Sequence, residues 1–197
     1  MPRSRIVLAG AFGGIAMFAW MSVAHLVLPL GAAGISQITN NEPALLADMH
    51  NAIGQEPGLY MFPSFRDIPD HSAASMQAYE RKLAANPSGL LIYHPPGAKA
   101  MTPGQLITEF LLELIEALLA VFLLAQTRLV SYAARVGFVT VVGILAALPT
   151  NVSYWNWYGF PTSYTMAYMT SQILGFVVAG LVAAALLRQR AAQPVAA

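Results

Sequence analysis

The sequence predicts an all-α membrane bundle of four transmembrane helices, with a small extracytoplasmic α/β insertion between the first and second helices. Charged residues make up 10% of the 197-residue chain and hydrophobic residues 57%, whereas soluble domains carry about 25% charged residues. The chain also holds four apolar stretches close to the roughly 20 residues that a helix needs to cross the hydrocarbon core of a bilayer. The predicted helices cover residues 6–30, 105–127, 132–149 and 163–187.

The arginines set the expected orientation of these helices. Six arginines lie at helix ends with no acidic residue among them, whereas the other basic residues share the 31–104 segment with six acidic residues. Because positively charged loops stay on the cytoplasmic side, we expect both termini in the cytoplasm and residues 31–104 outside. The chain is then a multi-pass protein of the cell inner (plasma) membrane. The six arginines are Arg3, Arg5, Arg128, Arg135, Arg188 and Arg190.

The first predicted helix, residues 6–30, also has features of a secretory signal. Arg3 and Arg5 precede it, and the small residues 31–34 follow it. Its apolar length exceeds the roughly 7 to 15 residues of a signal-peptide core. We therefore expect an uncleaved membrane helix.

The insertion, residues 31–104, is too long for a simple connection and is expected to fold as a small domain. Its pattern predicts a helix over 41–53, a strand over 59–62, a helix over 72–85 and a strand over 90–93. The two helix–strand halves form a weak internal repeat. Strands that are joined through a helix are expected to pair in parallel with a right-handed crossover, if they pair.

Two helix starts carry recognisable signals. Asn41 can cap the first helix of the insertion, with Pro43 in its first turn. At the second membrane helix, Thr102 and Gln105 have the spacing of a capping box, and Pro103 suits the first helical position.

The second predicted membrane helix carries the most informative residues, Glu109, Glu113 and Glu116. At about 100° per residue, the three carboxylates fall within an arc of roughly 60° on one helix face. Acidic residues inside a membrane cost about 2.5 kcal/mol or more, so they normally face the interior of a bundle and serve a function. Glu109 lies close enough to the surface to extend outward to water, but Glu113 and Glu116 lie deeper.

Polar residues of two other helices are expected at similar depth. His25 lies near the outer end of the first helix, and Tyr168 and Gln172 lie near the outer end of the fourth. We expect these side chains to share one polar layer with the glutamates. Small residues at four-residue spacing fill the inner half and allow close helix packing, which predicts a cavity open to the outside rather than a pore. The small residues are Ala11, Gly14, Ala120, Gly175, Ala179 and Ala183.

Repulsion between the glutamates requires compensation. Shared protons, a cationic His25 or a bound metal would each provide it, and the sequence indicates no particular cofactor or metal. The other histidines, His50, His71 and His94, lack the short spacing of a zinc site. The chain has no cysteine, which excludes thiol chemistry and disulfides.

Three functions remain open. We favour a small binding or accessory membrane protein with an outward-facing polar cavity over proton- or cation-coupled transport along the glutamates. A membrane enzyme that uses His25 and a glutamate as acid and base ranks third, so we lean against an enzyme. The expected partners are the lipid bilayer and either further copies of the chain or another membrane subunit. Nucleic acid is not expected, because basic residues are too sparse.

Overall fold

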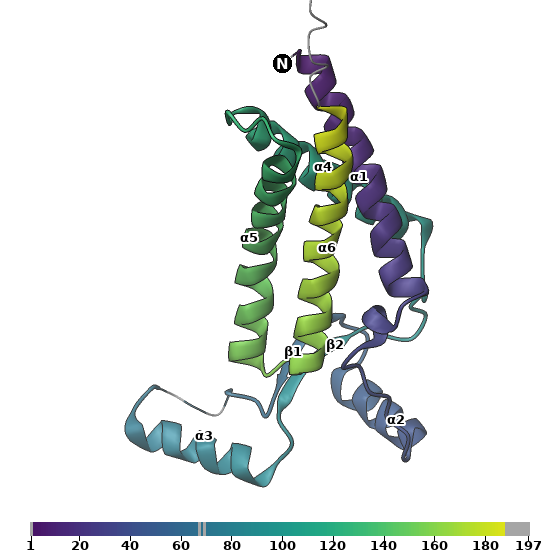
Figure 1. Cartoon of the computed structure of the whole chain (residues 1–197). Helices are drawn as coiled ribbons and strands as arrows, with labels where there is room; N and C mark the ends of the chain where they lie inside the picture. The colour runs from purple at the N-terminus through teal and green to yellow at the C-terminus, as the bar shows by residue number, and fades with distance from the viewer. Residues whose placement is uncertain (1, 67, 69, 188–197) are drawn as a thin grey trace, which may run out of the picture. The chain divides into compact units, whose positions relative to one another are not determined.

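The computed structural model describes residues 2–66, 68 and 70–187, and the chain divides into two compact units. The helical unit contains the residues up to 35 and those from 101 onward, and the insertion unit contains residues 36–100. The described elements, labelled in Figure 1, are α1 (Arg3–Leu26), the 3-10 helix η1 (Pro29–Ala32), α2 (Glu42–Ile53), β1 (Gly58–Phe62), α3 (Ala73–Ala85), β2 (Gly89–Tyr93), α4 (Pro103–Ala125), α5 (Tyr132–Tyr158) and α6 (Thr162–Leu186).

The four long helices of the helical unit are arranged in the order α4, α1, α6, α5. Helix α1 packs against both α4 and α6, and α6 packs against both α1 and α5, whereas α4 and α5 contact each other only slightly. The start of α1, the end of α6 and the α4–α5 connection lie at the same end of this unit (Figure 1). We call it the arginine end.

Two arginine side chains donate hydrogen bonds to backbone carbonyl groups at the C-terminal end of α6. Arg5 of α1 donates from Nε to the carbonyl oxygen of Leu186 at 2.8 Å, and Arg135 of α5 donates from Nη1 to that of Leu187 at 2.9 Å. Arg135 also donates from Nε to the Leu129 carbonyl at 3.0 Å. The last carbonyls of a helix have no partner within the helix and carry partial negative charge, so these cations stabilise the end of α6.

The structure gives one of the arginines a role inside the helical unit. Arg135 is only 3% exposed, and its charged guanidinium group donates hydrogen bonds within the helical unit. Arg3 and Arg128 are exposed at the same end. Arg188 and Arg190 lie outside the described residues.

The apolar core occupies the half of the helical unit toward the arginine end. Its members come from α1, from the second halves of α4 and α6, and from the first third of α5. Small residues dominate, which allows the helices to approach closely. The core residues are Ala9, Met17, Ala117, Ala120, Val121, Leu124, Val139, Phe176, Ala179, Ala183 and Leu187.

Three of the described helices, α1, α5 and α6, are long and apolar enough to cross a membrane. Helix α4 has a similar length of 23 residues but carries the three glutamates. The chain is therefore a mostly helical protein with three candidate spans and a fourth long apolar helix that carries three acidic residues.

Two helix ends differ from the prediction. Helix α1 ends at Leu26 rather than at Leu30, because Leu28 is extended before Pro29 and the residue before a proline avoids helical geometry. Helix α5 continues through Pro149 to Tyr158, whereas the prediction ended it at Pro149. Proline is tolerated inside membrane helices where neighbouring groups satisfy the backbone.

Helix α5 ends before a glycine, Gly159. Gly159 has a φ of 69° and donates its N–H to the Tyr154 carbonyl, a left-handed helix end that glycine adopts without steric cost. Inside the helix, buried Asn151 donates from Nδ2 to the Ala147 carbonyl at 2.8 Å. Trp155 and Trp157 therefore lie in the last turns of this helix.

In the insertion unit, β1 and β2 pair in antiparallel fashion, so the predicted parallel pairing is wrong. Phe62, the end of β1, lies opposite Gly89, the start of β2. The segment that contains α3 thus leaves and re-enters the sheet at the same end. It acts as a long hairpin connection, whereas a parallel pair would need the chain to travel back along the strands.

The predicted helix starts are borne out unequally. Thr102 Oγ1 accepts from the Gln105 N–H, and Gln105 Oε1 accepts from the Thr102 N–H at 2.7 Å, which confirms the capping box. Asn41 does occupy the position before α2, but it has a φ of 54° and makes no side-chain capping bond. Its amide is therefore not the cap that the sequence predicts.

Candidate functional site

The three glutamates of α4 differ sharply in exposure. Glu109 is exposed, Glu116 is half-buried and Glu113 is only 3% exposed. Glu113 thus points into the helical unit rather than away from it. One helix face therefore leads from an exposed carboxylate to a buried one.

Glycines of α1 allow this helix to pack closely against α4 at Glu113. A Cβ atom on Gly14 would lie 2.7 Å from the Leu114 Cα atom and 3.2 Å from the Glu113 carbonyl oxygen. A Cβ on Gly10 would lie 3.0 Å from the Leu118 Cα atom. Only glycine lets the α1 backbone approach α4 this closely, and this contact covers the α4 backbone at Glu113.

The buried polar layer contains two oxygen atoms with no hydrogen-bond partner among the described residues. They are Glu113 Oε2 and Gln172 Oε1. A buried polar atom without a partner costs about 1 to 3 kcal/mol, so native proteins seldom keep one without a reason. Both atoms belong to the residues that the sequence places at matching depths.

His25 and Tyr168 are exposed members of the polar layer. Their rings meet edge-to-face with centroids 6.5 Å apart. His25 Nδ1 lies 2.9 Å from the Met21 carbonyl oxygen, and because a carbonyl only accepts, Nδ1 carries the hydrogen. Nε2 is then the ring nitrogen that remains for other contacts.

The glutamates and Tyr168 lie within electrostatic reach of one another. Glu109, Glu113 and Glu116 all lie close enough to the Tyr168 hydroxyl for their charges to act on it. The structure therefore brings α4, α1 and α6 side chains into one neighbourhood. Gln172 lies one helical turn beyond Tyr168 on α6.

A column of aromatic rings leads to this layer and was missed in the sequence. Tyr154 at the end of α5 stacks on Phe160 with centroids 5.4 Å apart, and Phe160 contacts Tyr164 at 5.5 Å. Tyr164 stacks on Tyr168 at 6.0 Å, and Tyr168 meets His25. The spacing of four residues between Tyr164 and Tyr168 was the available signal, but the α5 contribution depends on the turn at residue 159.

The remaining histidines lie in the insertion unit. His50 Nδ1 lies 3.4 Å from the Tyr93 hydroxyl, which donates to the Gly54 carbonyl at 2.9 Å. His50 and His94 both line an open pocket of about 470 Å³ against β2. Within the part of the chain that the structure describes, no three histidine or acidic side chains are grouped as metal ligands.

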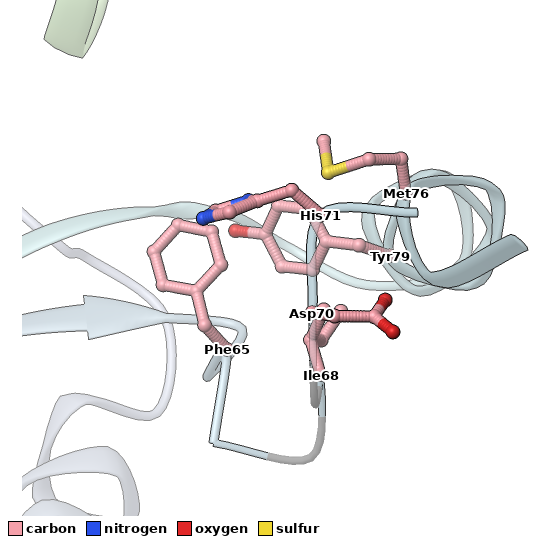
Figure 2. Close-up of a pocket in the computed structure, with 6 residues that line it drawn as sticks. All are labelled: Phe65, Ile68, Asp70, His71, Met76 and Tyr79. Atoms are coloured by element: carbon pink, nitrogen blue, oxygen red, sulfur yellow. The ribbon is translucent and has the colours of Figure 1, made fainter. Parts of the chain in front are cut away.

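A second pocket of the insertion unit, of about 450 Å³, lies between α3 and the segment before it. Figure 2 shows the rings of Phe65, His71 and Tyr79 gathered together, while the Asp70 carboxylate points away from them. Asp70 accepts from the Ser72 N–H at 3.0 Å and from the Ser75 hydroxyl at 2.7 Å. These hydrogen bonds hold the start of α3, so the carboxylate serves the fold rather than the pocket.

Hydrogen bonds to the Asp70 carboxylate also change its acidity. The Ser72 side chain, the Ser75 hydroxyl and the Ser72 backbone N–H lower the pKa of Asp70 from 3.8 to about 2. Each of them favours the charged form.

Comparison with protein-family models, with curated proteins and with solved structures gives no match for this chain.

Proposed function

We propose that this chain is a four-span membrane protein that binds a ligand or a partner at a polar site inside its helical unit. Three helices have the length and composition of membrane spans. Helix α4, with 23 residues, is about 35 Å long at 1.5 Å per residue, enough for a hydrocarbon core of about 30 Å. The insertion unit follows as an extracytoplasmic domain, because the arginine end is the cytoplasmic side by the positive-inside rule.

The observation that carries the proposal is the unpartnered Glu113 Oε2 atom in a residue that is 3% exposed. A glutamate with no function inside the membrane would extend its carboxylate toward the membrane surface. The Glu113 side chain is instead buried in the helical unit, where a polar atom without a partner lowers the stability of the fold. Side chains of this kind are retained at functional sites inside membranes.

Carbodiimide labelling tests the site. Dicyclohexylcarbodiimide partitions into lipid and reacts with carboxyl groups there, whereas water-soluble carbodiimides modify exposed carboxyl groups. In purified protein in nanodiscs we expect the lipophilic reagent to modify Glu113, and the water-soluble reagent to modify Glu109 but not Glu113. Peptide mass spectrometry reads out each position. Equal reaction of Glu113 with the water-soluble reagent contradicts a buried site, and Glu113→Gln controls for assignment.

Single cysteines test the four spans, and the native chain has no cysteine to interfere. Ala74, Val130 and Trp157 are all exposed positions outside the core of the helical unit. Cysteine at Ala74 and at Trp157 should react with an impermeant maleimide added to intact cells, and cysteine at Val130 should react only after lysis. If Ala74 and Val130 variants label from the same side, α4 does not cross the membrane.

Proton-coupled transport is the second candidate, favoured by three carboxylates in succession on one face of α4: exposed Glu109, buried Glu113 and half-buried Glu116. Carboxylates one helical turn apart suit stepwise proton transfer. Proteoliposomes that contain a pH-sensitive dye would then acidify faster than empty liposomes when a proton gradient is imposed. Glu113→Gln should abolish the difference. Equal rates for protein-containing and empty liposomes count against transport and leave binding as the function.

A further inference from the structure

The two unpartnered atoms of the polar layer share one chemical property. With Glu113 ionised, Glu113 Oε2 and Gln172 Oε1 are both hydrogen-bond acceptors, because a carboxylate and an amide oxygen both offer lone pairs. A ligand that satisfies both atoms must therefore bring hydrogen-bond donors. An anion or an ether-like group would leave both atoms unpaired.

The charges near the layer favour a cationic donor. Three carboxylates lie on α4, and within the described helical unit every arginine lies at the arginine end, next to the end of α6, and there is no lysine. His25 is the titratable basic group at the layer, and its Nδ1 is committed to the Met21 carbonyl. The negative charge of the layer is thus matched by no permanent cation from this unit.

Aromatic rings supply the remaining side of the site. The Tyr168 ring contacts the rings of Tyr164 and His25. The face of a tyrosine ring attracts cations within about 6 Å of its centre. Carboxylates, an amide oxygen and an aromatic wall together form the surroundings that an ammonium group prefers.

We propose that the polar layer binds a primary ammonium group, which donates to Glu113 and Gln172 beside the Tyr168 ring. This inference rests on the proposed intramembrane site. The ammonium comes either from a lipophilic amine or from a lysine of a partner membrane helix, since both present the same three N–H donors.

Competition in nanodiscs tests the chemistry of the ligand. Three probes share a dodecyl chain: dodecylamine offers charge and donors, dodecyltrimethylammonium offers charge alone, and dodecanol offers a hydroxyl without charge. We expect dodecylamine to reduce dicyclohexylcarbodiimide labelling of Glu113 at least fivefold more than either of the other two. Gln172→Leu should weaken this protection without abolishing labelling, because Glu113 itself is retained.

The outcomes separate this inference from the proposed function. If Glu113 is labelled but no probe protects it, the ammonium proposal is wrong and the buried site remains. If dodecyltrimethylammonium protects as well as dodecylamine, charge alone is recognised and the donor requirement is wrong. If Glu113 is not labelled by the lipophilic reagent at all, the proposed function itself fails.

Crosslinking in native membranes distinguishes the two sources. A carbodiimide-activated Glu113 forms an amide with an amine held beside it, and the activated oxygen leaves as a urea. A product enlarged by a small amine identifies a lipophilic ligand, and a product joined to a second polypeptide through lysine identifies a partner helix. A crosslink to Lys82 or Lys99 of the same chain overturns the proposal, because the donor is then internal.

Discussion

Gly14 of α1 lies directly against the backbone of Glu113 on α4, with room for a hydrogen but not for a side chain. A Cβ atom at Gly14 would lie 3.2 Å from the Glu113 carbonyl oxygen. The contact brings the backbones of α1 and α4 together at a residue whose side chain is only 3% exposed. Close packing at a glycine and a buried carboxylate therefore occur at the same position of α4.

Replacing Gly14 with alanine should destabilise the helical unit. The new Cβ would meet the Leu114 Cα atom at 2.7 Å, and backbone cannot move aside as a flexible side chain can. We expect the free energy of unfolding to fall by about 1 to 3 kcal/mol. We also expect Glu113 to react more with a water-soluble carbodiimide. Gly137→Ala is the matched control, since nothing lies within 4 Å of its Cβ position, and it should be neutral or stabilising by up to about 1 kcal/mol. Equal melting temperatures for both variants would contradict the close contact.

Replacing Arg135 with methionine should loosen the end of α6. The change removes the hydrogen bonds to the carbonyls of Leu187 and Leu129 while keeping most of the apolar volume. We expect a loss of about 2 to 3 kcal/mol, because hydrogen bonds from charged donors are strong and cations stabilise helix C-termini. Thermal unfolding in nanodiscs measures the loss. Arg128→Met, at an exposed position of the same end, should change stability little; a similar loss in both variants would point to net charge instead.

Paired cysteines should report the antiparallel register of the insertion unit. Leu59 lies opposite Ile92, whereas a parallel alignment of Gly58 with Gly89 would place Leu59 opposite Leu90. A disulfide needs Cα atoms within about 7 Å. Cysteines at Leu59 and Ile92 should therefore oxidise readily to an intramolecular disulfide, and cysteines at Leu59 and Leu90 should not. The reverse pattern would restore the parallel pairing.

The start of α3 should depend on the charge of Asp70. Its pKa is lowered from 3.8 to about 2 in the folded protein, so its hydrogen bonds stabilise the fold fully above about pH 4. That contribution decreases as the pH falls below 4 and is lost as the pH passes through about 2. A carbon-13 titration of the Asp70 carboxyl group should show a midpoint near 2. A midpoint near 4 would show that the Ser72 and Ser75 hydrogen bonds do not persist in solution.

Local signals allowed much of the fold to be predicted from the sequence. Apolar runs located α1, α4, α5 and α6, and the Thr102 capping box marked the start of α4, because both features depend on residues close together in the chain. The end of α5 was misplaced since a proline acts as a stop only where its effect on the backbone is not compensated. Strand direction was wrong because it depends on the path of the chain around α3, which no local pattern records.

The candidate site divides in the same way. The periodicity of α4 is enough to place three carboxylates on one face, but it cannot say which of them is buried. That distinction depends on packing between helices, such as the contact of Gly14 with α4, which joins segments about 100 residues apart in the chain. The aromatic column was missed for a similar reason, since Tyr154 reaches Phe160 only because Gly159 reverses the chain.

An experimental density map of the protein purified from its native membrane tests the central claim most directly. The account predicts that the Glu113 carboxylate lies between α1, α4 and α6, and that density for a non-protein group or a partner side chain lies within hydrogen-bond distance of Glu113 Oε2. A map in which the Glu113 side chain points outward into lipid acyl chains, or in which a donor from the same chain pairs with Oε2, would contradict it.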